Sequence, residues 1–263
     1  MSEQDALRIE HDDGILTLTL NDPPMNRMSF AYMDALEQAV QEAGEDPAVR
    51  VLVFTAEGDR NFSVGMDLKQ LVRGAAARGG PEAVFDQRLH VLAAIENLPK
   101  PSIATLFGYC LGGGLELPLA CHFRLAAAEG AKIGLPEMEL GSVPAWGGTA
   151  RLTRCVGRAH ALDMILRAKK VGGPEALRIG LVHEVHPVAE LKDAARALAR
   201  ELAAMPPVAV AGVLRCVVGA GDAPLDEALA EERRAVLRCG GTKDQIEGMR
   251  AFLEKRRPVF TGE

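Results

Sequence analysis

The stretch that decides the fold runs from Phe107 to Arg151 and opens with Gly108-Tyr109-Cys110-Leu111-Gly112-Gly113-Gly114-Leu115-Glu116. An extended apolar run, Pro101 to Gly108, leads into it, and a helical run follows the three glycines. Glycines at such a junction expose backbone N–H groups toward a ligand, and the helix dipole adds positive potential at the same place. The stretch therefore suits the binding of an anion or an oxyanion. Taken alone, the triplet favours a plain strand-to-helix turn.

Two carboxylates accompany the glycines. Glu116 lies in the apolar run Leu115-Glu116-Leu117-Pro118-Leu119-Ala120, so we expect it to be buried or to line a cleft. Glu137 follows a proline-fixed turn, and of Glu137 and Glu139 only one is expected to face inward. Burial raises a carboxyl pKa and a helix N-terminus lowers it, and the sequence leaves open which effect prevails. Two carboxylates beside an oxyanion site can move protons next to an activated carbonyl.

Composition narrows the class of protein. The chain has 263 residues and a net charge of −6, which argues against a nucleic-acid binder that relies on bulk charge. No run approaches the roughly 20 apolar residues that span a bilayer, and the polar segment Met1 to Glu10 resembles neither a secretory signal nor a transit peptide. The five cysteines are scattered, without a C-x-x-C pair, which indicates free thiols in a reducing cytosol. We therefore expect a cytoplasmic protein.

The pattern of elements predicts an α/β body followed by helices. Asp12-Asp13-Gly14 separates two apolar alternations, 7–10 and 15–20, and predicts a β-hairpin. Residues 70–82 have no clear strand pattern and are expected to form a mobile segment beside a site. No strand is predicted after Pro206, so the chain divides into residues 1–203 and 204–263. Further strands are expected at 51–55, 101–108, 123–127 and 181–186, and helices at 30–44, 81–97, 147–167, 188–205, 206–219, 224–238 and 242–257.

Several functional motifs are excluded. Gly112 and Gly114 with Leu117 fail the G-x-G-x-x-G pattern of dinucleotide folds, and a G-x-x-x-x-G-K-[ST] phosphate loop does not occur. The sequence His183-Glu184-Val185-His186 is not H-E-x-x-H, and metal-ligand spacing is absent. Residues 61–65 lack the first glycine of a nucleophile elbow.

Four segments, in order, resemble the crotonase, or enoyl-CoA hydratase/isomerase, family. Residues 62–69 read Phe-Ser-Val-Gly-Met-Asp-Leu-Lys, similar to the family's Phe-x-x-Gly-Ala-Asp-[Leu/Ile]-Lys. The glycine segment 108–117 matches next, followed by 134–152, which holds Gly-Leu-Pro-Glu and Pro-Ala-Trp-Gly-Gly-Thr. Residues 247–256 resemble the family's terminal Glu-Gly-x-x-Ala-Phe-x-x-Lys-Arg, and the resemblance covers almost the whole chain.

The resemblance implies a fold and an assembly. Residues 1–203 would form an α/β, crotonase-like spiral of β-β-α units that carries the active site. Residues 204–263 would form an all-helical oligomerisation segment that builds a homotrimer, often paired into a dimer of trimers.

The resemblance also implies catalytic roles. The backbone N–H groups of Met66 and Gly113 would form an oxyanion hole, although the family usually has alanine where Met66 stands. Glu116 and Glu137 match the two catalytic glutamates of hydratases. Because both are present, hydration of a 2,3-unsaturated acyl-CoA is the expected activity. Coenzyme A would enter as part of the substrate, and no metal, nicotinamide or other cofactor is expected.

Binding roles follow in the same way. By resemblance, Asp67, Leu68 and Lys69 would lie beside the adenine of coenzyme A, and Phe252 and Lys255 of a neighbouring subunit would close over the nucleotide. Lys255 alone is equally consistent with complementing a helix dipole. The acyl pocket would include Leu111 and Trp146. For Trp146, a core aromatic and a bulky wall of the acyl site remain equally open, so acyl chain length is not predicted.

Two other functions remain open at this point. One is double-bond isomerisation or another oxyanion-dependent reaction of acyl-CoA, because many family members that isomerise or cleave lack one of the glutamates. The other is an interaction protein with a vestigial coenzyme A site, for example an RNA binder as some relatives are. The acidic composition disfavours nucleic acid as a partner.

Overall fold

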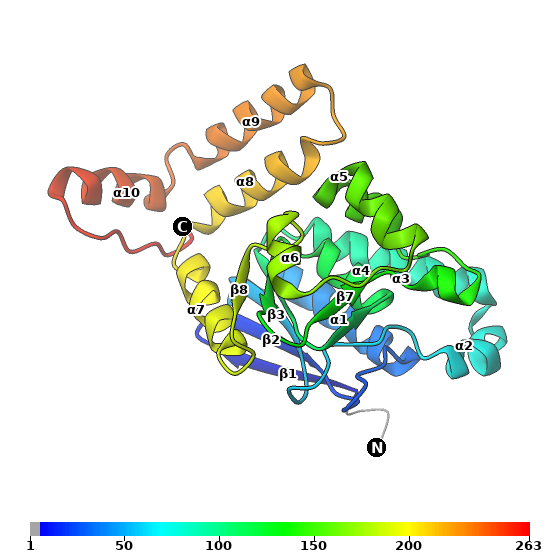
Figure 1. Cartoon of the computed structure of the whole chain (residues 1–263). Coiled ribbons are helices and arrows are strands. Elements are labelled where there is room, and N and C mark those ends of the chain that lie inside the picture. Colours follow the sequence, from blue (N-terminus) through cyan, green and yellow to red (C-terminus); the bar gives the residue numbers. More distant parts are fainter. Residues whose placement is uncertain (1–5) are drawn as a thin grey trace.

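The body of the molecule is built on a six-stranded sheet in the order β1-β2-β3-β4-β6-β8 (Figure 1). The computed structural model describes residues 6–263. β1 and β2 form the predicted antiparallel hairpin, and the other neighbouring strands of this sheet are parallel. The strands are β1 Leu7–Asp12, β2 Ile15–Leu20, β3 Val51–Ala56, β4 Ser102–Leu106, β6 Phe123–Ala127 and β8 Glu184–His186.

A second, two-stranded parallel sheet positions the site. It pairs β5, Tyr109–Leu111, with β7, Lys132–Gly134, so that Leu111 lies opposite Gly134. Because β5 and β7 are parallel, the segments that follow them leave the small sheet at the same edge. The glycine triplet follows β5, and the turn with Glu137 follows β7. Parallel pairing thus brings together two segments that are about 20 residues apart in sequence.

Helices surround the sheet. The interior strands are almost continuously apolar, as expected for a sheet covered on both faces, and β3 is buried along its whole length. α7 packs against β3, β4 and β6, while α1 packs on α3 and α4 on α5. The helices of the body are α1 Phe30–Glu45, α2 Leu68–Gly74, α3 Pro81–Glu96, α4 Gly113–Ala120, α5 Gly148–Leu166, α6 Gly173–Arg178 and α7 Leu191–Ala203.

The C-terminal helices α8 Pro207–Gly219, α9 Leu225–Cys239 and α10 Lys243–Glu254 form an arm that extends from the body (Figure 1). α8 packs against α9, where Gly212 allows the close approach of Ala235. The arm leaves large apolar side chains exposed, which in a single chain is unfavourable. They include Val213, Val217, Leu229, Val236, Leu237, Met249, Phe252 and Leu253.

The structure corrects three predicted elements. Residues 70–82, for which no element was predicted and a mobile segment was expected, are largely helical: α2 is followed by a 3-10 helix, η2, at Ala75–Arg78. The reason is a cap that we did not identify, because the Asp67 carboxylate accepts hydrogen bonds from the amides of Lys69 and Gln70. The predicted strand 181–186 is shorter, because the Leu181 amide donates to Ala176 and ends α6 in a turn.

The third correction concerns the long helix after the second glycine segment. α5 is interrupted at Gly157, whose backbone is non-helical with φ of 77°. Within residues 6–263, no single helix is long and apolar enough to cross a membrane. α7 and α8 together meet that length and composition, but the chain bends by 110° between them.

Candidate active site

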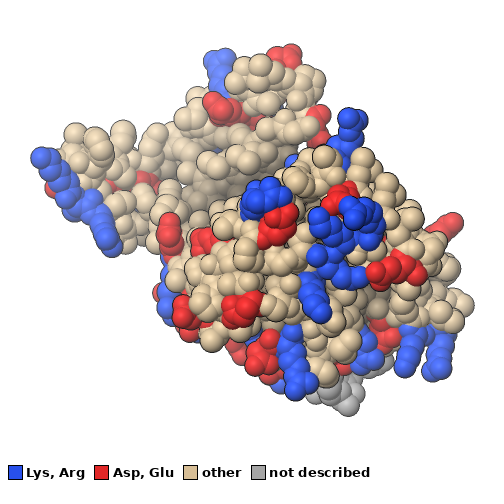
Figure 2. Space-filling view, in the orientation of Figure 1, with Lys and Arg blue, Asp and Glu red and all other residues tan. Residues whose placement is uncertain are grey.

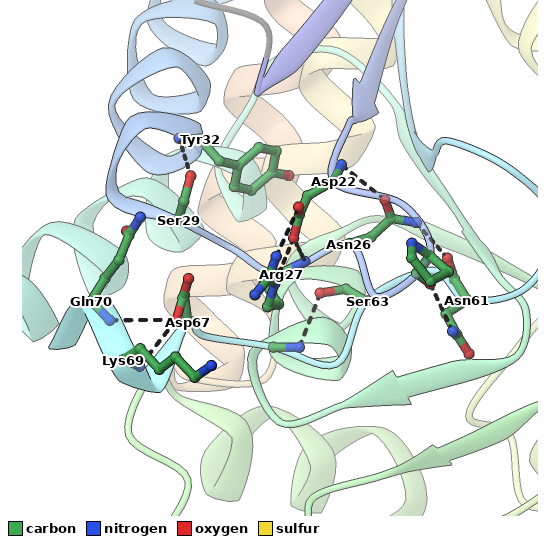
Figure 3. A network of polar contacts seen from close by, with 12 residues as sticks. Asp22, Asn26, Arg27, Ser29, Tyr32, Asn61, Ser63, Asp67, Lys69 and Gln70 are labelled. Carbon is green, nitrogen blue, oxygen red and sulfur yellow. Dashed lines mark hydrogen bonds and ion pairs between the residues drawn. The ribbon is translucent and has the colours of Figure 1, made fainter. Parts of the chain in front are cut away.

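The first wall of the site is the segment from Ser63 to Asp67, which is held rigidly from both sides. The Ser63 hydroxyl accepts a hydrogen bond from the Gly65 amide at 3.0 Å (Figure 3). The Met28 amide donates to the Gly65 carbonyl at 2.8 Å, and the Asp67 amide donates to the Met28 carbonyl at 3.3 Å. Met66 lies between these anchors, and its amide donates no hydrogen bond within the described residues.

Gly65 lets this wall approach the glycine triplet. Its φ is +86°, a conformation that favours glycine. A Cβ atom placed on Gly65 would lie 2.7 Å from the Leu111 carbonyl oxygen and 3.1 Å from the Gly113 amide nitrogen. The backbones at residues 65 and 113 are therefore in direct contact, and a side chain at position 65 would separate them.

Gly113 begins helix α4. The Gly112 amide is used by the small sheet, where it donates to the Gly134 carbonyl at 3.1 Å. The Leu115 and Glu116 amides turn back onto the Gly112 carbonyl. The Gly113 amide, one of the N-terminal donors that an α-helix leaves without a partner, has no acceptor among residues 6–263. Met66 and Gly113 thus offer two available amides on adjoining backbone segments.

A cavity of about 360 Å³ opens at these amides. Its wall is mostly apolar, and among the described residues the carboxylates of Glu116 and Glu137 are the only charged groups that line it. Such a composition suits an apolar ligand that carries one reactive polar centre. It is lined by Val64, Gly65, Met66, Leu68, Leu71, Val72, Phe85, Gly112, Gly113, Glu116, Pro136, Glu137, Leu140, Ser142, Val143, Ala145 and Trp146.

Glu116 is one turn into α4 and is 2% exposed. Its Oε1 accepts hydrogen bonds from the Trp146 amide at 2.8 Å and the Gly148 amide at 2.9 Å, and no described residue donates to Oε2. Burial raises the pKa of this carboxyl to about 7, and the two amides offset part of that effect by stabilising its anion. The sequence left open whether burial or the helix N-terminus would dominate the pKa of Glu116. In the structure the effect of burial is the larger.

Glu137 opens the 3-10 helix η3, Glu137–Leu140, directly after β7. Its Oε1 lies against Gly112, since a Cβ on that glycine would be 2.7 Å away. Its Oε2 is buried without a hydrogen-bond partner in the described chain, and burial raises the pKa of the group. Glu139, by contrast, is exposed and pairs with Lys170 at 2.8 Å, so Glu137 is the one that faces inward.

The raised pKa of Glu116 predicts that this carboxyl destabilises the folded protein at high pH. A carboxyl with a pKa of 4.5 unfolded and about 7 folded favours the folded state below 4.5, and that contribution is lost as pH rises through 7. Glutamine at position 116 stays neutral and keeps an oxygen for both amides. The free energy of unfolding of Glu116→Gln, relative to wild type, should therefore rise by about 3 kcal/mol between pH 4.5 and pH 8. Urea unfolding at both pH values measures it; a difference that does not change with pH would contradict the burial of an ionisable group here.

Residues 10–263 match the family model described as enoyl-CoA hydratase/isomerase. The chain belongs to the enoyl-CoA hydratase/isomerase family. It is 36% identical over 261 residues to a probable enoyl-CoA hydratase of Bacillus subtilis, covering 98% of this chain and 99% of the relative. It is 37% identical to a carnitinyl-CoA dehydratase of Escherichia coli K12 over the full length of both chains.

Solved structures agree with the enoyl-CoA hydratase/isomerase assignment. An enoyl-CoA hydratase from Bacillus anthracis superimposes with a TM-score of 0.92 at 32% identity, over 98% of this chain and all of its own. DspI of Pseudomonas aeruginosa gives 0.92 at 34% identity, with 97% of each chain covered. The predicted fold class, an α/β crotonase-like fold with C-terminal helices, is thereby confirmed.

One expected residue of this family member does not reach the cavity. Leu111 was expected in the acyl pocket, but it is not among the lining residues. It ends strand β5, where its amide donates to the Ser63 carbonyl at 3.0 Å, and the next residue, Gly112, is the first of this segment to line the cavity. Trp146 does line the cavity and is only 3% exposed, so its ring is both a buried aromatic and a wall. A Cβ on Gly113 would lie 2.2 Å from Trp146 Cζ3, which places the ring directly on the glycine.

The residues expected to bind coenzyme A fall into two groups. Leu68 lines the cavity, while Asp67 and Lys69 flank it at the start of α2 (Figure 3). Phe252 and Lys255 lie on and just after α10, at the far end of the arm, and do not line the cavity of their own chain. Phe252 is 82% exposed.

Two buried asparagines support the family site and were not singled out from the sequence. Asn61 donates to the Pro24 carbonyl at 2.8 Å and accepts from the Tyr109 amide at 2.9 Å. Asn26 donates to the Asn61 carbonyl at 2.7 Å (Figure 3). They join the loop after β2 to the strand that leads into the glycine triplet. Only their positions in two polar turns could have suggested this, which is too weak a signal in a single sequence.

Proposed function

We propose that this family member is an enoyl-CoA hydratase, which adds water across the 2,3-double bond of an acyl-CoA thioester. The observation that carries the proposal is one cavity that contains both Glu116 and Glu137 beside the available amides of Met66 and Gly113. The reaction needs an oxyanion site and two positions for proton transfer, and these four groups supply them.

The thioester oxygen would accept hydrogen bonds from the Met66 and Gly113 amides. Negative charge gathers on that oxygen when water attacks C3, so the amides stabilise the transition state more than the ground state. Because both amides belong to tightly anchored backbone, they need no reorganisation during the reaction. Loss of one such donor typically costs about 3–4 kcal/mol of transition-state stabilisation.

The two glutamates would share one proton. The Trp146 and Gly148 amides stabilise the anion of Glu116, so this carboxylate is suited to take a proton from the water. Glu137 Oε2 is buried without a donor, which favours its protonated form, and it would deliver a proton to C2. The charge of Glu137 adds to the effect of burial and raises the pKa of Glu116 further.

The proposal is tested with crotonyl-CoA and with longer and aromatic 2,3-unsaturated thioesters. Hydration is followed as the loss of absorbance of the conjugated thioester, and the product is identified by mass. The expected result is turnover of at least one member of the panel. If none is hydrated, and none of the corresponding 3-hydroxyacyl-CoA thioesters is dehydrated in the reverse direction, the proposal is wrong.

Double-bond isomerisation is the second candidate, and one observation favours it. Glu116 Oε1 is already occupied by two amides, whereas Glu137 Oε2 has no hydrogen-bond partner in the described chain, so Glu137 could move a proton between two carbons alone. In that case Glu137→Gln should abolish turnover of a 3-enoyl-CoA while Glu116→Gln keeps most of it. Equal losses would count against isomerisation.

The face of the body that Figure 2 draws does not favour a nucleic-acid partner. Figure 2 shows basic and acidic side chains interspersed over this face of the body, without a continuous basic area. The net charge of −6 points the same way.

We also propose that the arm of α8–α10 assembles the chain into a homotrimer or a dimer of trimers. Burial of its exposed apolar side chains against other subunits would be favourable, and Phe252 and Lys255, which do not line the cavity of their own chain, would then be able to close over that of a neighbour. Light scattering is expected to give a mass of three or six chains. Val217→Glu together with Val236→Glu, both on the arm, should shift that mass toward the monomer, whereas Val72→Glu on α2 should not. A monomeric wild type would contradict the proposal.

A further inference from the structure

A buried arginine lies behind the tryptophan of the cavity. Arg88 is on α3 and has 0% of its surface exposed, and Phe85, one turn earlier on the same helix, lines the cavity. The Arg88 guanidinium carbon is 5.9 Å from the centre of the Trp146 ring and 5.3 Å from that of Phe30. A cation is therefore held one aromatic ring away from the acyl end of the site.

The hydrogen bonds of this guanidinium are incomplete. Its Nη1 donates to the side chain of Gln87, but neither Nε nor Nη2 has an acceptor among the described residues. These two nitrogens form one edge of the guanidinium plane, the edge that binds a carboxylate through two parallel hydrogen bonds. Burial of unpaired donors on a cation is costly, and it lowers the pKa of Arg88 to about 10.

Neighbouring carboxylates do not fill that edge. Asp34 accepts from Arg78 at 2.6 Å and from Gln87 at 2.9 Å, and Glu37 accepts from Gln87 at 2.7 Å. Their negative charges raise the pKa of Arg88 and so offset part of the cost of burying the cation. The Nε/Nη2 edge still has no acceptor among the described residues.

The Trp146 ring can turn without moving the backbone that carries it. Its amide is fixed by Glu116 and its carbonyl accepts a hydrogen bond from Arg151 at 2.9 Å, so its backbone is held at both ends. The indole makes no hydrogen bond to any residue of the described chain, so only the side-chain torsions of Trp146 must change for the ring to turn.

We propose that Arg88 is a specificity residue that binds a carboxylate at the distal end of the substrate's acyl chain, so that the enzyme prefers dicarboxylic acyl-CoA thioesters. The inference rests on the proposed function and narrows its substrate class. In the bound state the distal carboxylate accepts two hydrogen bonds from Arg88 Nε and Nη2, and the Trp146 ring turns aside to admit the chain.

Binding of unreactive, saturated thioesters tests the inference without hydration. Monocarboxylic and dicarboxylic acyl-CoA thioesters are compared as pairs of equal length, from about four to eight carbons. Trp146 is the only tryptophan of the chain, so its fluorescence reports directly on the ring that must move. We expect the dicarboxylic member of at least one pair to bind about tenfold or more tightly, with a change in tryptophan emission that its partner does not produce.

Substitutions of Arg88 test whether its guanidinium causes the preference for the dicarboxylic thioester. Arg88→Met should reduce the preference to about one, and Arg88→Lys should keep only part of it, because lysine keeps the charge but lacks the planar fork. Arg78→Met is the matched control: Arg78 also stacks on Phe30, at 4.6 Å, but pairs with Asp34, so the preference should persist. Thermal unfolding establishes that each variant is folded.

The possible failures can be told apart. If no thioester of either kind binds, the proposed function is wrong together with the inference. If both members of every pair bind wild type equally, or if Arg88→Lys and a folded Arg88→Met keep the full preference, only the inference is overturned. If Arg88→Met does not fold, the ratio of the affinities for the dicarboxylic and monocarboxylic thioesters, measured in wild type and in Arg88→Lys, still tests the inference.

Discussion

Glu137→Gln is expected to lower kcat for hydration of crotonyl-CoA by a factor of about 10²–10⁴, the contribution of a well-positioned proton donor. Glutamine has nearly the same shape as glutamate, and it can occupy the same place against Gly112. It cannot give a proton to C2, however, so the carbanion that forms after attack of water reverts. The loss should appear in kcat at saturating substrate, with binding of crotonyl-CoA, measured separately, largely retained.

Glu116→Gln should lose a similar factor, because the attacking water is then without a base. The double variant should lose little more than either single one, since both groups act in one proton transfer. Glu139→Gln is the control: two residues from Glu137 on the same turn, it is exposed and paired with Lys170, and its activity should stay within about twofold of wild type. Retention of more than a tenth of wild-type kcat by Glu137→Gln would contradict its role as proton donor.

The sequence predicted the parts of the molecule that local rules determine. The Asp-Gly turn at Asp13 and Gly14 gave the hairpin, and the apolar run around Glu116 indicated a carboxylate that is in fact buried. Pairing of β5 with β7 was not predicted, although it is what brings the glycine triplet to Glu137. Non-local pairing of two three-residue strands leaves almost no periodic signal.

Other features depended on contacts between distant segments. Leu111 was expected in the acyl pocket because it lies beside the glycines, but it ends strand β5 and is not among the residues that line the cavity. The position of Trp146 on Gly113 and of Arg88 behind it depends on how α3, α4 and the loop before α5 pack, which sequence spacing does not specify. The cap at Asp67 was a local signal that could have been identified, since aspartate before a helical run is a common N-cap.

Gly114→Ala is expected to disrupt both the fold of the site and its activity. A Cβ on Gly114 would lie 2.3 Å from the Ser63 carbonyl oxygen, and that carbonyl already accepts the Leu111 amide. Neither backbone segment can yield easily, because the Gly65 amide is tied to the Ser63 side chain and α4 is buried along its whole length. Forcing extra volume into such a contact typically costs about 1–3 kcal/mol of stability.

Displacement of these two backbone segments would also affect catalysis. Ser63 lies three residues before Met66, and Gly114 directly follows Gly113. Separating the two segments moves the oxyanion donors apart, and the loss of one donor corresponds to about 10²–10³ in kcat. Gly44→Ala in helix α1 is the matched control, since its Cβ would meet only Leu98 Cδ2 at an ordinary 3.6 Å and alanine favours a helix. Its stability should be unchanged or raised by up to about 1 kcal/mol, with full activity. Full hydratase activity in Gly114→Ala would show that the contact between residues 63 and 114 does not set the spacing of the amides, and the oxyanion geometry inferred for Met66 and Gly113 would then be wrong.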